Sequence, residues 1–384
     1  MILTHSFFKA LPTQKIKVWV LAPSIHSNDS NIDCYYDFSQ SIKEYTDAFA
    51  ELNICWKWQP VTMMTYRRVI RKIEAEKEEG KYFPIVMNLC DGDEINGTPG
   101  ISVVKLLSEK NLAFTGSDEY FYNITTSKIP MKTAFDMEGV PNAPWESILN
   151  EDYECNGIFE KLGSPVIIKP SVSGGSMGVG IKNVVENKKE FDSLIKNMFA
   201  GYRGWNLTAD GLIAEKFITG PEFTTLITGS YNHPKKAIVH NPVERVFHPS
   251  LPAKEQFLSF DRLWEIYEDE SPMPRDENFY EYKVPDQELI EPIKKLSWDA
   301  YCATKGKGYT RVDIRMDAIT KKLYVLEVNA QCGLSEDENF TSTGAILRLG
   351  GKTFAQMIVE ILNDAIVRYA NKQRFTRIRN KARA

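Results

Sequence analysis

The first 115 residues alternate between short apolar runs and amphipathic stretches, and this pattern restricts the fold more than any other feature of the sequence. Strands are predicted at residues 16–23, 54–61, 83–89 and 112–115, with helices between them at 38–52, 65–79 and 99–109. Strands that alternate with helices are typical of a parallel sheet covered on both faces. We therefore expect an N-terminal α/β domain of this kind.

A glycine-rich segment follows the apolar residues 165–168 and leads into a second apolar run. It reads Lys-Pro-Ser-Val-Ser-Gly-Gly-Ser-Met-Gly-Val over residues 169–179, which predicts a strand, a turn and a strand. Backbone N–H groups can surround phosphate oxygens where glycine leaves the approach open, and Lys169 would add a positive charge. Neither a P-loop nor a dinucleotide fingerprint is present, so an ordinary glycine-rich hairpin is the alternative.

Residues 309–329 predict a β-hairpin, because charged and apolar residues alternate before a polar turn and a second apolar strand follows it. If the hairpin is centred on that turn, Asp313 lies opposite Glu327. Arg311 then lies opposite Asn329, and all four side chains share one face. Two carboxylates and an amide supply the hard oxygen ligands that Mg²⁺ prefers, with Mn²⁺ as an alternative ion. A charged face turned to solvent is the competing interpretation, but it explains poorly why Asn329 closes an apolar strand.

Several motifs together resemble those of ATP-grasp ligases, and D-alanine–D-alanine ligases in particular. In chain order they are Phe-Thr-Gly-Ser at 114–117, Lys128, Lys169-Pro with the glycine-rich turn, Ala-Glu-Lys-Phe-Ile-Thr-Gly-Pro-Glu at 214–222, Arg311-Val-Asp313 and Glu327-Val-Asn329. The resemblance covers about residues 83–362. It implies a multidomain α/β and α+β protein with an ATP-grasp fold behind the N-terminal parallel-sheet domain. The expected domains are 1–123, 124–218 with the phosphate flap, and 219–384 with the metal site and lid.

The resemblance also implies roles for individual residues. Those that would bind ATP are Lys128, Lys169, Gly174, Gly175, Ser176, Met177, Gly178, Glu215, Lys216, Phe217, Ile218 and Glu222. Among them, Glu215 and the hinge after it would read the adenine edge, and Glu222 would hold the ribose hydroxyls. Asp313, Glu327 and Asn329 would bind one or two magnesium ions.

Three residues are expected to act on the reacting groups. Arg311 would face the reacting carboxylate, and Lys169 would contact the phosphates. A lid around residues 276–284 would bring Lys283 to the terminal phosphate, although the acidic, proline-containing stretch 265–281 also fits a solvated loop. The implied reaction joins a carboxylate to an amine through an acyl phosphate, with release of ADP and phosphate. Such catalysis consists mostly of positioning and charge neutralisation.

The motifs expected to bind substrate depart from those of D-alanine–D-alanine ligases. The Gly-Gly-x-Ser-x-Glu turn that anchors the first substrate's amino group is replaced by Ala-Pro-Ser-Ile-His-Ser-Asn-Asp at residues 22–29. The serine of the flap becomes Gly175, and the His-Gly pair becomes Asp91-Gly92. Pro-Gly-Met after the metal-binding asparagine becomes Gln-Cys-Gly-Leu at 331–334. From these differences we expect that the first substrate is not D-alanine but another amino acid or a carboxylated metabolite.

Composition restricts the class of protein further. A net charge of −4 gives no reason to expect a nucleic-acid partner, and neither a membrane-spanning run nor a signal-peptide pattern is apparent. We therefore expect a cytoplasmic enzyme with small-molecule substrates, and the resemblance suggests a homodimer. The basic tail, 372–384, is expected to be a solvated helix end. Two other functions stay open: a phosphotransferase that stops at the acyl phosphate, and a non-catalytic ATP-binding scaffold.

Overall fold

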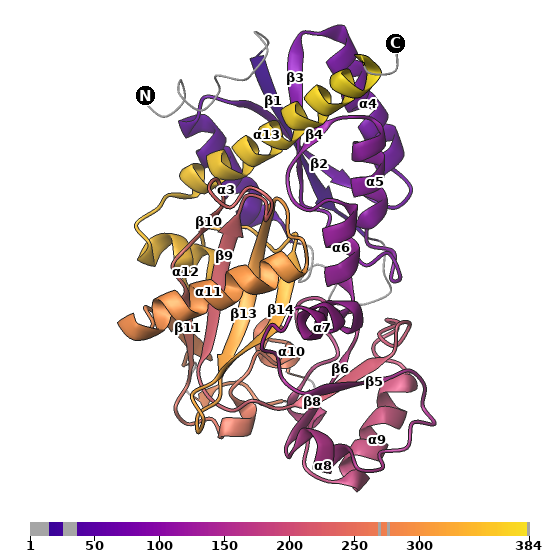
Figure 1. Ribbon diagram of the computed structural model, residues 1–384, viewed down its shortest axis with the longest axis vertical. Helices are drawn as coiled ribbons and strands as arrows, with labels where there is room; N and C mark the ends of the chain where they lie inside the picture. The colour runs from indigo at the N-terminus through magenta and orange to yellow at the C-terminus, as the bar shows by residue number, and fades with distance from the viewer. Residues whose placement is uncertain (1–14, 26–36, 268–269, 275–276, 382–384) are drawn as a thin grey trace.

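The computed structural model describes residues 15–25, 37–267, 270–274 and 277–381. Three sheets organise these residues, and the first confirms the predicted N-terminal parallel sheet (Figure 1). Its strand order is β2-β1-β3-β4 and all its pairings are parallel. Its elements are β1 (Lys15–Pro23), α3 (Ser39–Glu51), β2 (Cys55–Val61), α4 (Tyr66–Glu79), β3 (Tyr82–Asn88), α5 (Ile101–Glu109) and β4 (Ala113–Phe114).

Two helices lead from the first sheet to the second, which is antiparallel with the order β5-β8-β6-β7. The elements in chain order are α6 (Glu119–Thr126), α7 (Lys128–Met137), β5 (Trp145–Ile148), α8 (Ile158–Leu162), β6 (Val166–Pro170), η1 (Ile181–Asn183), β7 (Val184–Val185), α9 (Lys188–Phe199) and β8 (Leu212–Lys216). The glycine-rich segment joins β6 to β7, as predicted, although a short 3₁₀ turn delays the second strand.

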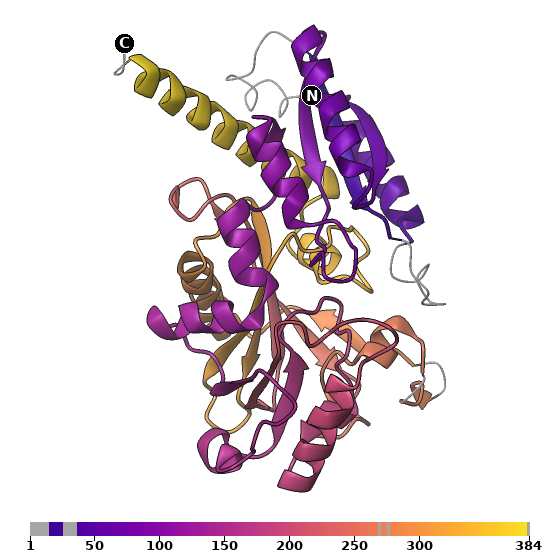
Figure 2. The same ribbon diagram turned by 90° about the vertical axis from the view of Figure 1, so that its right-hand side faces the viewer.

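The third sheet is antiparallel and has the order β12-β11-β9-β13-β14, with β10 paired to β9. Its elements are β9 (Glu222–Thr228), β10 (Ile238–Val239), β11 (Val243–Phe247), η2 (Ala253–Glu255), α10 (Phe260–Trp264), β12 (Tyr280–Lys283), α11 (Gln287–Ala303), β13 (Tyr309–Met316), β14 (Leu323–Ala330), α12 (Ser342–Leu349) and α13 (Phe354–Lys381). The first and second sheets lie towards opposite ends of the molecule (Figure 2).

The predicted hairpin register is confirmed. Asp313 pairs with Glu327 and Arg311 pairs with Asn329 across β13 and β14. One irregularity follows Asp313, because Ile314 pairs with Val325 and the register shifts at this point. The shift lies on the turn side of the four polar residues, so it leaves their pairing intact.

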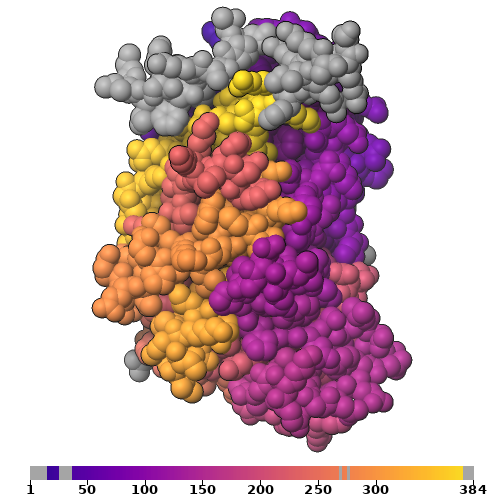
Figure 3. Space-filling view, in the orientation of Figure 1, coloured from indigo at the N-terminus to yellow at the C-terminus, as the bar shows by residue number. Residues whose placement is uncertain are grey.

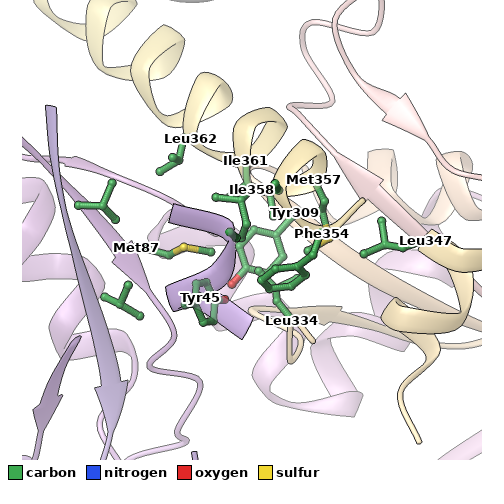
Figure 4. Packing of buried hydrophobic residues seen from close by; sticks show 14 of the residues in the cluster. Tyr45, Met87, Tyr309, Leu334, Leu347, Phe354, Met357, Ile358, Ile361 and Leu362 are labelled. Carbon is green, nitrogen blue, oxygen red and sulfur yellow. The ribbon is translucent and has the colours of Figure 1, made fainter. Parts of the chain in front are cut away.

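Helix α13 joins the end of the chain to the N-terminal sheet. It extends over Phe354–Lys381 and so continues into the basic tail. Its apolar side chains, among them Phe354, Ile358 and Leu362, pack in one buried cluster with Tyr45 of α3 and residues of the first sheet (Figure 4). The predicted C-terminal domain therefore completes the core of the N-terminal one.

Polar contacts support the same junction. The Arg368 guanidinium donates hydrogen bonds to the carbonyl oxygens of Phe114 and Gly116, at 3.0 and 2.9 Å. In the space-filling view the atoms of α13 lie against the N-terminal part of the molecule (Figure 3). The three sheets fall within the three predicted domain ranges, and the boundaries themselves stay predictions. Among the helices of the described residues, none is long and apolar enough to span a bilayer.

Candidate active site

A cavity of about 510 Å³ opens where the three sheets meet, and its walls come from each of them. Residues that follow β1 and β3 form one wall, the glycine-rich turn and the end of β8 form another, and β13 and β14 form the floor. The chain has therefore gathered motifs that are more than 200 residues apart in the sequence around one volume. Most of the predicted site residues line it.

The glycine-rich turn borders this cavity through Gly174, Gly175 and Ser176. The backbone of Gly175 and Ser176 is left-handed, with φ of +56° and +61°, which bends the chain sharply at this point. Trp264 of α10 donates an indole hydrogen bond of 2.8 Å to the Gly175 carbonyl oxygen. The predicted Met177 and Gly178 are not among the lining residues. Gly178 serves packing instead, since a Cβ atom there would lie 2.6 Å from Leu207.

Lys169 points into the cavity from β6 and forms an ion pair with Glu215 of β8. Lys132 of α7 is also paired with this carboxylate, at 2.7 Å, although its own side chain is only 1% exposed. Burial alone would raise the pKa of Glu215, but the two ammonium groups outweigh it and lower that pKa to about 2. Glu215 is therefore ionised at neutral pH and pairs with two lysines.

This ion-pair cluster makes stability depend on pH. Because the folded-state pKa of Glu215 lies below its usual value of about 4.3, its contribution is present above that value and is lost as the pH falls towards 2. At pH 7 we expect wild type to have a higher free energy of unfolding than Glu215→Gln. This difference should shrink by on the order of 3 kcal/mol between pH 7 and pH 2. Urea unfolding of both proteins at several pH values measures this difference. A difference that stays constant over that range contradicts the assignment.

Lys128 connects the glycine-rich turn to the predicted metal site. It is the first residue of α7, and its ammonium group lies 3.4 Å from the Ser173 carbonyl oxygen and 3.7 Å from a carboxylate oxygen of Glu327. Burial lowers the pKa of Lys128, and Glu327 partly opposes that shift. The predicted phosphate-binding lysines, Lys128 and Lys169, therefore lie on one side of the cavity together.

The hinge residues Lys216, Phe217 and Ile218 line the cavity as predicted. The Phe217 ring packs against that of Phe257 with 5.7 Å between centroids, and apolar residues of β6 and the turn complete the cluster. This slot beside Phe217 and Phe257 is apolar, which suits a purine ring. Glu215, which is expected to read the adenine edge, is bound by two lysines, and the backbone N–H groups of Lys216 and Phe217 donate to the carbonyl oxygens of Pro144 and Pro165 at 2.9 Å each.

Glu222 is buried and already held by two arginines. Arg245 of β11 forms an ion pair with one carboxylate oxygen, and Arg315 of β13 lies 3.2 Å from the other. Arg245 also donates to the Tyr282 hydroxyl at 2.9 Å, and Arg315 donates to the Ile218 carbonyl oxygen at 2.9 Å. Glu222 lines the cavity, so a ribose hydroxyl would meet a carboxylate that is fixed in place by both guanidinium groups.

The floor of the cavity holds the predicted metal-binding residues side by side. Asp313 accepts hydrogen bonds from Thr224 at 2.9 Å, from Asn329 at 3.0 Å and from Arg311 at 2.9–3.2 Å. Burial would raise the pKa of Asp313, but Arg311 outweighs it and lowers that pKa. Glu327 also lines the cavity, with about a third of its side chain exposed. Two carboxylates and an amide oxygen, all lining one cavity, fit a Mg²⁺ ion.

Lys283 is the predicted catalytic residue that the structure does not bring to the cavity. In β12 the side chains of Tyr280 and Tyr282 line the cavity, whereas Lys283 alternates to the other face and lies 3.6 Å from Glu244. A contact with the terminal phosphate would require β12 to move. The predicted lid extends over residues that include 276, which lies outside the described residues.

Sequence reasoning missed four residues that build the site: Lys132, Arg245, Arg315 and Gln331. Two of them carried a signal. Lys132 follows Lys128 by one helical turn and so shares its face, and Arg315 continues the polar alternation of β13. Gln331 has a left-handed φ of +59°. Its amide oxygen accepts from the Ser117 backbone at 2.7 Å and its amide nitrogen donates to the Asn88 carbonyl oxygen at 2.7 Å, which ties the floor to the first sheet.

Comparison with known proteins places this architecture in a family. The model of the D-ala D-ala ligase C-terminus family matches residues 135–363. The chain is 24% identical over 324 residues to the D-alanine–D-alanine ligase of Clostridium beijerinckii, covering 80% of this chain and 94% of that one. It is 27% identical over 260 residues to the enzyme of Neisseria meningitidis serogroup B, covering 67% and 73% of the two chains.

Solved structures show the same fold at lower identity. The D-alanine–D-alanine ligase of Coxiella burnetii superposes with a TM-score of 0.65 at 16% identity, over 95% of this chain and 99% of that one. The Bacillus anthracis enzyme in complex with ATP has a TM-score of 0.63 at 18% identity, over 93% and 99% of the chains. The ATP-grasp fold expected from the motifs is confirmed. The chain belongs to the D-ala D-ala ligase C-terminus family and is an ATP-grasp enzyme of the ATP-dependent C–N ligase class.

Proposed function

We propose that this protein joins the carboxylate of one small substrate, an amino acid or a similar metabolite, to the amine of another. ATP would supply the energy through an acyl-phosphate intermediate, with release of ADP and phosphate. The observation that carries the proposal is the single cavity that holds a glycine-rich turn, two lysines, Arg311 and the carboxylates of Asp313 and Glu327. Phosphate-binding groups and groups that suit a carboxylate substrate thus share one volume.

In this proposal ATP binds on the side of the cavity formed by the second sheet. The adenine would enter the slot beside Phe217 and Phe257, and the phosphates would lie under the glycine-rich turn near Lys128 and Lys169. Mg²⁺ held by Asp313, Glu327 and Asn329 would neutralise phosphate charge. Arg311 lies in the same strand as Asp313, two residues before it, and pairs with Asn329. Its guanidinium can therefore bind the negative charge of a substrate carboxylate.

The chemistry requires no nucleophilic side chain. A carboxylate oxygen of the first substrate attacks the terminal phosphorus of ATP, and the bond from that phosphorus to the bridging oxygen of ADP breaks. The amine of the second substrate then attacks the acyl carbon, loses a proton and expels phosphate. Arg311 would stabilise the oxyanion of this second step. Water must be excluded from the site for as long as the acyl phosphate is present.

The identity of the two substrates belongs to the proposal. The related proteins carry the name D-alanine–D-alanine ligase, which does not support our expectation that the first substrate differs from D-alanine. The sequence argument for that expectation rests partly on residues 22–29, of which 26–29 lie outside the described residues. D-Alanine therefore belongs in any substrate panel beside other amino acids.

The test is phosphate release from ATP and Mg²⁺ with a panel of D- and L-amino acids, offered singly and in pairs, together with mass spectrometry of the products. Ligation predicts release that needs both a carboxylate and an amine, and an amide product in equal amount. Release with a carboxylate alone, without an amide, would identify a phosphotransferase. Absence of release with every pair would identify a scaffold, and either result would overturn the proposal.

A further inference from the structure

Among the described residues, Asp91 is a carboxylate of the cavity lining that forms no ion pair. The cations that line the cavity in the described part of the chain are all paired with a carboxylate: Lys128 with Glu327, Lys169 with Glu215, Lys216 with Asp317, Arg245 and Arg315 with Glu222, and Arg311 with Asp313. Asp91 also lines the cavity, and among those same residues it is the charged side chain without an ion pair. An open carboxylate in a ligand cavity is a site for a positive group of the ligand.

Asp91 occupies the wall of the cavity that the nucleotide does not need. It lies three residues beyond the end of β3, beside Leu89, while Pro23 at the end of β1 lines the same wall. Ligands of open parallel sheets bind outside the carboxyl ends of the strands. The second sheet supplies the nucleotide groups on the other side, so Asp91 faces the space left for the substrates that are joined.

The loop that carries Asp91 is fixed before any ligand arrives. The backbone N–H of Gly92 donates to the Pro99 carbonyl oxygen at 3.0 Å, and the Tyr122 hydroxyl donates to the Gly92 carbonyl oxygen at 2.7 Å. At Gly100 a Cβ atom would lie 1.8 Å from that same oxygen, so the loop closes tightly on itself. A carboxylate on such a rigid loop loses little freedom when it binds a ligand.

We propose that Asp91 binds the ammonium group of the substrate whose carboxylate is activated, so that this substrate is an amino acid. The proposal rests on the proposed ligase function. An amine that attacks the acyl phosphate must be neutral, whereas an amine held by Asp91 stays protonated and is kept out of the reaction. The nearby acidic groups, Asp93 and Glu94, do not line the cavity and are used within the loop, where they accept backbone hydrogen bonds. One carboxylate alone suits an ammonium ion better than a divalent cation, which needs six or more oxygen ligands.

The electrostatics of the wall agree with this assignment. Asp91 is exposed, yet the surrounding protein atoms replace part of its hydration and, together with the charge of Asp93, raise its pKa to about 6. The groups that interact with it, Cys90, Tyr122 and Tyr309, carry no positive charge. A bound ammonium group would favour the ionised carboxylate, so the affinity for the amino acid should rise as the pH increases from 5 to 7.

The test measures binding directly, by calorimetry with the imido analogue of ATP and MgCl₂. The probes are the twenty L-amino acids, D-alanine and D-serine, followed by the deaminated form of the compound that binds best, such as propionate for alanine. Asp91→Asn should weaken binding of the amino acid by about 10-fold to 100-fold and leave binding of the deaminated compound unchanged. Asp91→Glu should recover part of the loss. The matched control, Asp47→Asn on the exposed face of α3, should bind like wild type.

Kinetics separates this role from a merely structural or basic one. In the ligation assay Asp91→Asn should raise KM for the first substrate and leave kcat within a few-fold of wild type, and it should flatten the pH dependence of KM between pH 5 and 7. A loss confined to kcat, equal weakening of the deaminated compound, or binding of no amino acid would overturn the proposal. If wild type binds the amino acid through Asp91 but forms no amide, the ligase function fails and this inference stands.

Discussion

Glu327→Gln is expected to reduce ATP-dependent phosphate release by at least about 10³-fold while the protein stays folded. A bound metal ion stabilises the charge of a phosphoryl-transfer transition state by several kcal/mol, and about 4 kcal/mol corresponds to this factor. The glutamine keeps the size of the side chain but removes the negative charge from the metal site. Glu327 is partly exposed and its ion pair with Lys128 spans 3.7 Å, so little folding energy depends on it.

Asp313→Asn should have the same effect on phosphate release, because the second carboxylate of the metal site is lost. Asp299→Asn is the matched control, since it makes the same chemical change in an exposed i,i+4 pair of α11. Stopped-time phosphate assays over a range of Mg²⁺ concentrations, with thermal unfolding of each variant, measure the effect. Turnover that survives in both Glu327→Gln and Asp313→Asn would remove the metal assignment.

Lys132→Met is expected to lower the free energy of unfolding by about 3–5 kcal/mol. The methionine fills a similar volume, but Glu215 loses one of its two cationic partners while its side chain remains 2% exposed. A buried carboxylate that loses one of its two ammonium partners lowers the free energy of unfolding, because water cannot reach it to replace the missing group. Urea unfolding at pH 7 measures the difference from wild type.

A double-mutant cycle isolates the ion pair from the packing of the new side chain. Lys132→Met combined with Glu215→Gln should cost much less than the sum of the two single changes, because no unpaired carboxylate is left. Lys43→Met is the matched control, since Lys43 forms an exposed pair on α3 with a side chain that is 77% exposed, and it should change stability by less than about 0.5 kcal/mol. A loss below about 1 kcal/mol for Lys132→Met would show that the cluster is not an energetic anchor.

The sequence predicted local features well because each depends on neighbouring residues. Alternation of period two and the polar turn were enough to place Asp313 opposite Glu327, and the register shift after Asp313 did not disturb that pairing. The same holds for the strands and helices of the N-terminal sheet, whose observed bounds differ from the predicted ones by one or two residues at most ends. Periodicity indicates which face of an element is apolar. In these elements that face packs against the neighbouring element in the sequence, so local pattern was enough.

Features that depend on distant contacts could not be predicted in the same way. Glu222 was expected to be free for a ribose, but its two arginines come from β11 and β13, and only the sheet order β11-β9-β13 brings both to it. Helix α13 was expected to belong to the C-terminal domain, and no local pattern indicates that it packs on the first sheet. The lid motif predicts that Lys283 reaches the terminal phosphate. Successive side chains of β12 point to opposite faces, however, so Lys283 points away from the cavity that Tyr282 lines.

The central claim is that a substrate carboxylate attacks ATP in the cavity that Arg311, Asp313 and Glu327 line. The most direct measurement uses an amino acid with both carboxylate oxygens labelled with ¹⁸O, in the ligation reaction with its amine partner. Attack by the carboxylate predicts that one ¹⁸O atom appears in each phosphate released and one remains in the amide. Phosphate without the label, formed together with the amide or with unchanged amino acid, would contradict the account.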